Sequence, residues 1–152
     1  MAAGDFLVFD QFLVDVQEGL HDLENDTIKL GLVTASVTPA VTTSDGRWGA
    51  GGSTNFTTNQ VAPGGNYSSG GPTVANPTVT LTGGAAVFDG GDITINQNGS
   101  NPTNARWGIL YNDTDAGKRA IGYLDLGAAT DLTSGDFVVS WSASGIHSFN
   151  QA

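Results

Sequence analysis

The apolar residues near the start of the chain repeat with the spacing of an α-helix. Between residues 9 and 23 they recur at steps of three and four, at Phe9, Phe12, Leu13, Val16, Leu20 and Leu23. At about 100° per residue these side chains share one face of a helix. Asp15, Glu18 and Asp22 fall on the opposite side. The pattern predicts an amphipathic helix over residues 5–24 with an acidic outer face.

The spacing of apolar residues changes from helical to alternating immediately after this segment. Ile28, Leu30 and Leu32 occupy every second position, and the residues between them are charged or small. Side chains of a β-strand point alternately to opposite faces, so this spacing places the three apolar residues on one face. The pattern predicts that residues 27–34 form the first strand.

Residues 35–77 carry little apolar surface and many residues that interrupt regular structure. They include eight glycines and four prolines, and Ser, Thr and Asn make up most of the rest. Such a segment cannot bury enough apolar surface on its own to offset the entropy of ordering it. Trp48, Phe56 and Tyr67 are spaced along it like anchors. We expect an extended loop or arm that orders on its own domain or on a neighbouring subunit.

Residues 78–152 show short alternating runs separated by turns. The alternating residues are Val79 and Leu81, Ile93 and Ile95, Trp107, Ile109 and Tyr111, Ile121 and Tyr123, and Phe137, Val139 and Trp141. Glycine pairs at 83–84 and 90–91 mark tight turns. Regularly punctuated strands of this kind predict a mainly β fold. We expect residues 1–152 to form one domain, an antiparallel β-sandwich or jelly-roll-like barrel with one N-terminal helix and a long Gly/Ser/Thr/Asn-rich loop.

The charge balance narrows the classes of partner. The net charge is −10, with 15 acidic residues against 5 basic ones, and only 13% of residues are charged. Phosphate groups repel so acidic a chain, so we expect it to bind neither nucleic acid nor anionic membranes. The chain has no cysteine, which excludes disulfides and thiol catalysis. Its stability must come from packing or from assembly.

Two histidines and one acidic turn are the nearest approach to a metal site. His21 and His147 stand far apart in the sequence and show no metal-ligand spacing. Residues 112–117 hold spaced carboxylates and a glycine, as a calcium loop does, but Lys118 and Arg119 follow at once. We therefore expect a hairpin turn there, with a weak calcium site as the alternative, and we predict no metal or cofactor.

No pattern of catalytic residues is found in the sequence. Asp89 and Asp92 flank a glycine pair, and paired carboxylates can hydrolyse glycans, but aspartate is equally favoured at such turns. No phosphate-binding glycine motif and no nucleophile elbow is present. We predict that the protein is not an enzyme.

Four stretches of the chain resemble small virion proteins of tailed bacteriophages. They are FLVDVQEGLHDLENDTIKLGLVTAS, ARWGILYNDT, AIGYLDLG and GDFVVSWSASG. The resemblance implies a structural protein made in the host cytoplasm and carried on the capsid surface. It implies a decoration or cement protein that binds the major capsid protein lattice and stabilises the head. We also expect a homo-oligomer, either a dimer or a trimer.

Two surfaces are candidates for binding the capsid. The aromatic residues of the arm, Trp48, Phe56 and Tyr67, would insert into the neighbouring subunit, because aromatic anchors dominate interface energetics. The acidic helix face, with Asp15, Glu18 and Asp22, would meet a basic capsid surface.

Two other classes of protein remain open. A tail- or fibre-associated virion protein would stack exposed aromatic rings on sugars, and a cellular carbohydrate-binding β-module or glycan-active enzyme is the third class.

Overall fold

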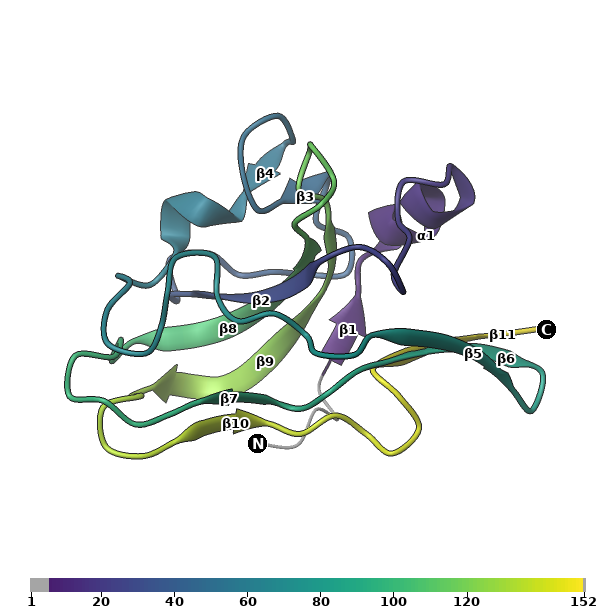
Figure 1. The fold of residues 1–152 in the computed structure, drawn as a ribbon. Helices are drawn as coiled ribbons and strands as arrows, with labels where there is room; N and C mark the ends of the chain where they lie inside the picture. Colours follow the sequence, from purple (N-terminus) through teal and green to yellow (C-terminus); the bar gives the residue numbers. More distant parts are fainter. Residues whose placement is uncertain (1–5, 152) are drawn as a thin grey trace.

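The computed structural model describes residues 6–151, and the chain folds mainly into antiparallel β-structure with one α-helix (Figure 1). The mainly β class predicted from the sequence is confirmed. Residues 1–5 and 152, which the predicted ranges include, lie outside the described residues. The elements are β1 (Phe6–Val8), α1 (Asp10–Gln17), β2 (Ile28–Val33), β3 (Gly46–Arg47), β4 (Thr54–Asn55), the 3-10 helix η2 (Phe56–Asn59), β5 (Thr78–Thr82), β6 (Ala85–Asp89), β7 (Ile93–Ile95), β8 (Ala105–Asn112), β9 (Ala120–Thr130), β10 (Phe137–Val139) and β11 (His147–Asn150).

The largest sheet has four antiparallel strands in the order β1-β9-β8-β2. Its centre is the long β8–β9 hairpin, which is buried along most of its length. β2 pairs with β8 so that Leu30 lies opposite Leu110 and Gly31 opposite Ile109. This strand falls within residues 27–34, where the alternating pattern places the first strand, and five of its six residues are buried.

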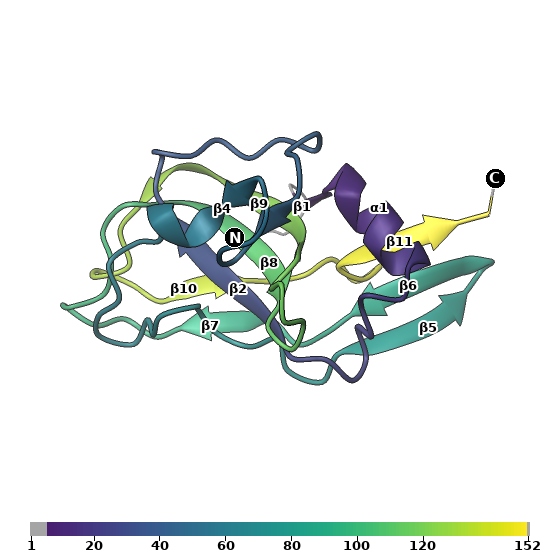
Figure 2. The ribbon, with the colours of Figure 1, turned by 90° about the horizontal axis from the view of Figure 1, so that it is seen from above.

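A second set of strands faces this sheet and continues beyond it (Figures 1 and 2). Residues 85–95 pair with residues 137–150 in two stretches, β7 with β10 and β6 with β11. The β7–β10 stretch runs alongside the four-stranded sheet, and its apolar residues join the same core. The β6–β11 stretch gains β5 as a third strand and extends away from the body of the molecule.

The α-helix is shorter than the range of residues 5–24 predicted from its periodicity. Phe6–Val8 form strand β1, because their backbone pairs with β9 in the register Phe6 to Leu124. Helix α1 begins at Asp10 and ends at Gln17. Gly19 follows with a φ of 72°, a left-handed conformation that ends helices and that glycine adopts without strain. Leu20 and Leu23, which belong to the predicted helical pattern, lie beyond the end of α1, and Leu23 is in a turn.

Residues 35–77 order on their own domain, one of the two expectations for this segment. They contain β3, β4 and η2, and they follow the open edge of β2. The amide of Leu30 donates to the carbonyl of Pro72, and the amide of Val61 donates to that of Leu32. The amide of Val74 donates to the carbonyl of Ile28. The segment is therefore held by backbone hydrogen bonds that an edge strand leaves unused.

The three aromatic residues of this segment belong to the core of the chain itself. Trp48, Phe56 and Tyr67 are 4%, 0% and 1% exposed. The ring of Trp48 stacks on Tyr111 at 5.0 Å between centroids, and the hydroxyl of Tyr67 accepts a hydrogen bond from the amide of Leu32. These side chains are therefore not available as exposed anchors for another subunit, which corrects that expectation.

Within residues 6–151 no helix is long and apolar enough to cross a bilayer.

Candidate functional site: an aromatic cleft beside a projecting sheet

The part of the chain that extends from the body is a three-stranded sheet, β11-β6-β5, here called the projecting sheet (Figures 1 and 2). Its outer hairpin turns at Gly83 and Gly84, with φ values of 59° and 85°. Two consecutive residues with positive φ are what a tight two-residue hairpin requires, and glycine supplies them. All five residues of β5 are exposed.

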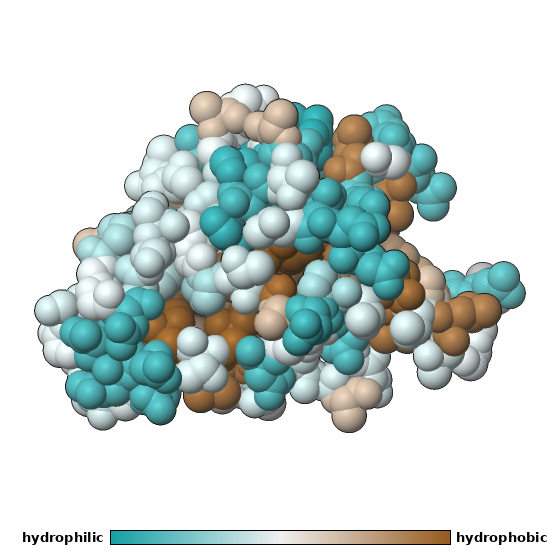
Figure 3. All heavy atoms as spheres, in the orientation of Figure 1, coloured by the Kyte–Doolittle hydropathy of each residue, from teal (hydrophilic) through white to brown (hydrophobic). Residues whose placement is uncertain are grey.

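One face of the projecting sheet is mainly apolar and carries one histidine. The pairing places Val79, Phe88 and His147 in one row across the three strands. It places Leu81, Ala86 and Phe149 in the next row. The opposite face carries mainly threonine, serine and other small or polar residues. Apolar surface gathers over α1 and along this hairpin in Figure 3, and Leu81 is the most exposed large apolar residue described, at 81%.

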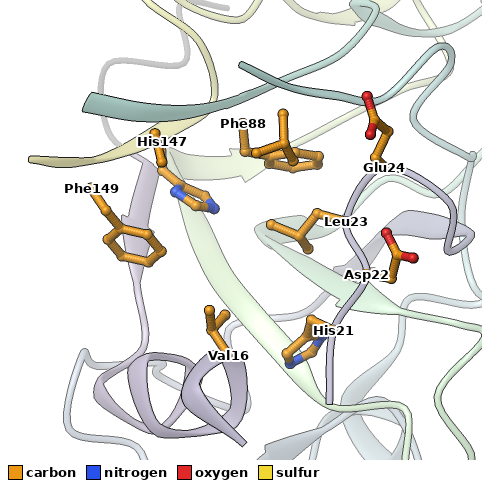
Figure 4. A pocket seen from close by; sticks show the side chains of 10 residues that line it. Val16, His21, Asp22, Leu23, Glu24, Phe88, His147 and Phe149 are labelled. Atoms are coloured by element: carbon orange, nitrogen blue, oxygen red, sulfur yellow. The ribbon is translucent and has the colours of Figure 1, made fainter. Parts of the chain in front are cut away.

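A cleft of about 500 Å³ lies between this apolar face and the turn that follows α1 (Figure 4). We call it the aromatic cleft. It is lined by Val16 and residues 21–24 on one side and by residues of β5, β6 and β11 on the other. Clefts of this size and apolar character are typical binding sites for small ligands or for side chains of a partner.

Phe12 of α1 packs against the inner end of the cleft and is completely buried. Its ring centroid lies 5.0 Å from that of His21, 5.4 Å from that of His147 and 6.1 Å from that of Phe149. Helix α1 presents this ring because the helical stripe points it away from solvent. The Phe12 ring therefore contacts both histidines, which are distant in sequence.

His147 brings an unsatisfied imidazole to the cleft. Both of its ring nitrogens are buried, and neither has a hydrogen-bond partner among the described residues. Burial lowers the pKa of His147 to about 4, so its ring is neutral near pH 7. A neutral imidazole has one N–H donor and one acceptor nitrogen, and in His147 both are enclosed by the packing around the ring and unpaired among the described residues.

His21 is held in one tautomer by Asn112. The side-chain Oδ1 of Asn112 accepts hydrogen bonds from the amides of Thr114 and Asp115, both at 3.0 Å. Its Nδ2 therefore faces the other way, where it donates to Asp26 at 2.6 Å and lies 3.2 Å from Nδ1 of His21. Nδ1 must accept this hydrogen bond, so the ring proton sits on Nε2.

The environment of His21 also keeps it uncharged. Burial is the largest effect and lowers the pKa of His21, although Asp15, Asp115 and Asp26 act in the opposite direction. Nε2 of His21 lies 3.9 Å from Oδ2 of Asp15 and has no hydrogen-bond partner among the described residues. The cleft thus holds two neutral imidazoles on apolar walls.

The acidic residues predicted to form one exposed face are divided by the structure. Asp15 is only 3% exposed, accepts a hydrogen bond from Gln11 at 3.0 Å and lies 4.0 Å from Nε of Arg119. Helical spacing cannot reveal this burial, because Arg119 comes from the distant β8–β9 turn, which packs on the side of α1 expected to face solvent. Glu18 is exposed, and Asp22 is exposed at the cleft.

The acidic turn at residues 112–118 uses its carboxylates in ion pairs. Asp113 is paired with Lys29 at 2.9 Å and with Lys118. Burial opposes ionisation of Asp113, but the hydrogen bonds from these two lysines outweigh it and lower its pKa. Asp115 is paired with Arg119 at 2.7 Å. The described residues contain no group of three or more side chains placed to hold a metal ion.

Asp89 and Asp92 perform the turn roles that their spacing also allowed. Oδ1 of Asp89 accepts from the amide of Gly90 at 2.9 Å, and Oδ1 of Asp92 accepts from the amide of Trp141 at 2.9 Å. Each carboxylate thus fixes local backbone between β6 and β7 or beside β10.

Comparison of the chain with known protein families, curated proteins and solved structures found no match.

Of the residues that line the cleft, only Asp22 was among the candidate interface residues predicted from the sequence. Phe88, His147 and Phe149 meet only because β6 pairs with β11 in one particular register. The sequence shows only that the run Thr78–Thr82 alternates and carries no charge, and its exposure is seen only in the structure. The cleft itself has no signal in the sequence.

Proposed function

We propose that this protein is a structural component of a tailed-phage virion, a capsid decoration or cement protein that binds the major capsid protein through the aromatic cleft. One observation carries the binding role: an open, largely apolar cleft of about 500 Å³ lies beside a sheet whose edge strand exposes Val79 and Leu81. The sequence resemblance supports the virion assignment. The binding role needs no catalysis, cofactor or metal.

Burial of apolar groups supplies the energy for such docking. Burying one large apolar side chain contributes about 1.5–3 kcal/mol. A partner that fills the space between Val16, Phe88 and Phe149 also shields Leu23 from water.

The charge around the cleft favours a basic partner. Asp22 and Glu24 lie at one side of it (Figure 4), and the whole chain carries −10. A capsid segment with apolar residues flanked by Lys or Arg would complement both the walls and this acidic rim. Complementary charge of this kind raises the rate of association more than the final affinity.

The fold suits a particle-bound role. The four-stranded sheet facing the long paired segments 85–95 and 137–150 supports an antiparallel β-sandwich as the architecture. A rigid core with one projecting sheet presents a binding surface without rearrangement. We include a homo-oligomer of the chain in this proposal, located on the capsid surface after synthesis in the host cytoplasm.

A tail- or fibre-associated role is the alternative virion assignment. That role needs exposed aromatic rings that stack on sugars, whereas Trp48 and Tyr67 are buried. Copy number separates the two assignments. Quantitative mass spectrometry of virions should find on the order of hundreds of copies for a decoration protein and about three to a dozen for a tail protein.

Charge reversal at the cleft tests the docking surface directly. Glu24→Lys should lower the occupancy of the protein on particles that lack it, measured by adding purified protein at increasing concentration. Glu18→Lys is the matched control, because Glu18 is an exposed glutamate outside the cleft lining. Equal loss of binding in both variants, or a loss only in Glu18→Lys, would move the docking surface from the cleft to the helix.

A further inference from the structure

The outer edge of the projecting sheet is left open. Among residues 6–151, β5 pairs with β6 alone. In an antiparallel pair half of the backbone N–H and C=O groups of an edge strand point away from its neighbour. The open edge of β2, by contrast, is covered by residues 59–74 of the same chain.

β5 also lacks the features that usually protect an edge strand from pairing with another chain. Such edges typically carry charged residues, a proline within the strand or a covering segment. The run Thr78–Thr82 has none of these, and it exposes Val79 at 43% and Leu81 at 81%. An exposed strand with this composition indicates an interaction site.

The charge distribution points to a second copy as the partner. Residues 48–88 contain no charged side chain, although the chain as a whole carries −10. Two copies approaching at most other surfaces would bring acidic residues together. At β5 they meet without this repulsion, whereas a basic partner would gain no ion pair from this strand.

The sequence of β5 is complementary to itself in an antiparallel pairing. With Thr80 opposite Thr80 of a second copy, Val79 lies opposite Leu81, and Thr78 lies opposite Thr82. Both apolar pairs then fall on one face, and the threonine pairs fall on the other. Threonine pairs and apolar pairs across strands both stabilise a sheet. The pairing ends naturally at Pro77, which has no backbone N–H to donate.

We propose that two copies of this chain form a two-fold dimer by antiparallel pairing of their β5 strands, centred on Thr80. The pairing joins the two projecting sheets into one sheet of six strands. The two apolar faces lie on the same side of it, so the two aromatic clefts open toward the same side. The dimer does not depend on capsid docking, which uses the cleft.

The dimer is tested first by its size in solution. Sedimentation velocity between about 1 and about 100 µM should show a dimer for the unaltered protein. Leu81→Asp should sediment as a monomer, because it places a charge in the apolar row of each copy. Leu13→Asp should remain dimeric, since Leu13 is an exposed leucine of α1, at 46%, outside the pairing. Circular dichroism checks that both variants are folded.

The register is tested by cysteine cross-linking, which is clean because the chain has no native cysteine. Thr80→Cys places two thiols directly opposite each other, so oxidation should form a covalent dimer. Thr82→Cys, on the same face of the same strand, should not cross-link, because its two copies would stand about 13 Å apart along the strands. A monomer at all concentrations, a trimer, or equal cross-linking of both variants would overturn the proposal.

Discussion

The ring of Phe12 lies edge-on to the imidazole of His147, with 5.4 Å between the ring centroids and 73° between the planes. This contact joins α1, near the start of the chain, to β11 at its end. It also excludes water from the His147 ring nitrogens, which have no hydrogen-bond partner among the described residues. The packing of the helix on the projecting sheet therefore depends on His147 being neutral.

Acid should destabilise the fold in the range where His147 becomes charged. Its pKa is about 4 in the folded chain against 6.5 in the unfolded chain, so the unfolded state binds a proton first as pH falls. The contribution of His147 to stability should be constant above pH 6.5, and it should decrease by about 3 kcal/mol as the pH falls from 6.5 to about 4. Urea unfolding at a series of pH values measures this dependence. His147→Phe should remove the part of this dependence that His147 contributes and leave the part that His21 contributes, and an unchanged pH dependence would contradict the assignment.

Replacing Asn112 by aspartate should change the protonation of His21. Asn112 donates its Nδ2 hydrogens to Asp26 and to Nδ1 of His21. In Asn112→Asp this donor becomes an acceptor, which favours a proton on Nδ1 and raises the pKa of His21. Nitrogen-15 NMR of the imidazole should show the Nε2–H tautomer in the unaltered protein and a higher His21 pKa in the variant. A wild-type ring protonated on Nδ1 would contradict this assignment.

A methyl group on Gly31 should destabilise the fold through Trp48. A Cβ at Gly31 would lie 2.3 Å from the Trp48 ring, and this ring is wedged against Tyr111. Gly31→Ala should therefore lower the free energy of unfolding by about 1–3 kcal/mol, the usual cost of overpacking a core. Gly135→Ala is the control, because nothing lies within 4 Å of a Cβ there. Chemical denaturation of the two variants should separate them clearly.

Truncation of Trp48 should destabilise the isolated chain rather than only an assembly. Trp48 is 4% exposed and packs on the chain's own sheet. Trp48→Ala should lower the unfolding free energy by about 3–5 kcal/mol, as for other large core residues. Thermal unfolding at low protein concentration, where any oligomer has dissociated, measures this loss. An unchanged melting temperature would assign Trp48 to an interface instead.

The sequence predicted the elements whose pattern is local. The alternation of Ile28, Leu30 and Leu32 is visible without knowing the neighbouring strands, and it located β2, although Gly31 and Val33 on the other face are buried as well. The helical spacing around Phe12 predicted a helix, but it placed Leu13 on the buried face and Asp15 on the exposed face, whereas Leu13 is 46% and Asp15 3% exposed. Periodicity could not set the start of that helix, since Phe6–Val8 are apolar in either structure and become a strand only by pairing with β9.

Only the tertiary structure decided what each buried side chain contacts, because those contacts join residues far apart in the chain. Asp15 is buried by Arg119, and Trp48 by Tyr111, and neither partner can be found from spacing. The cleft exists because His147 pairs opposite Phe88 in one register, and a shift by a single residue would turn its ring to the other face. The sequence alone determined the acidic charge, the absence of cysteine and the β-rich pattern. The packing of the arm, the cleft and the open edge of β5 followed from long-range pairing.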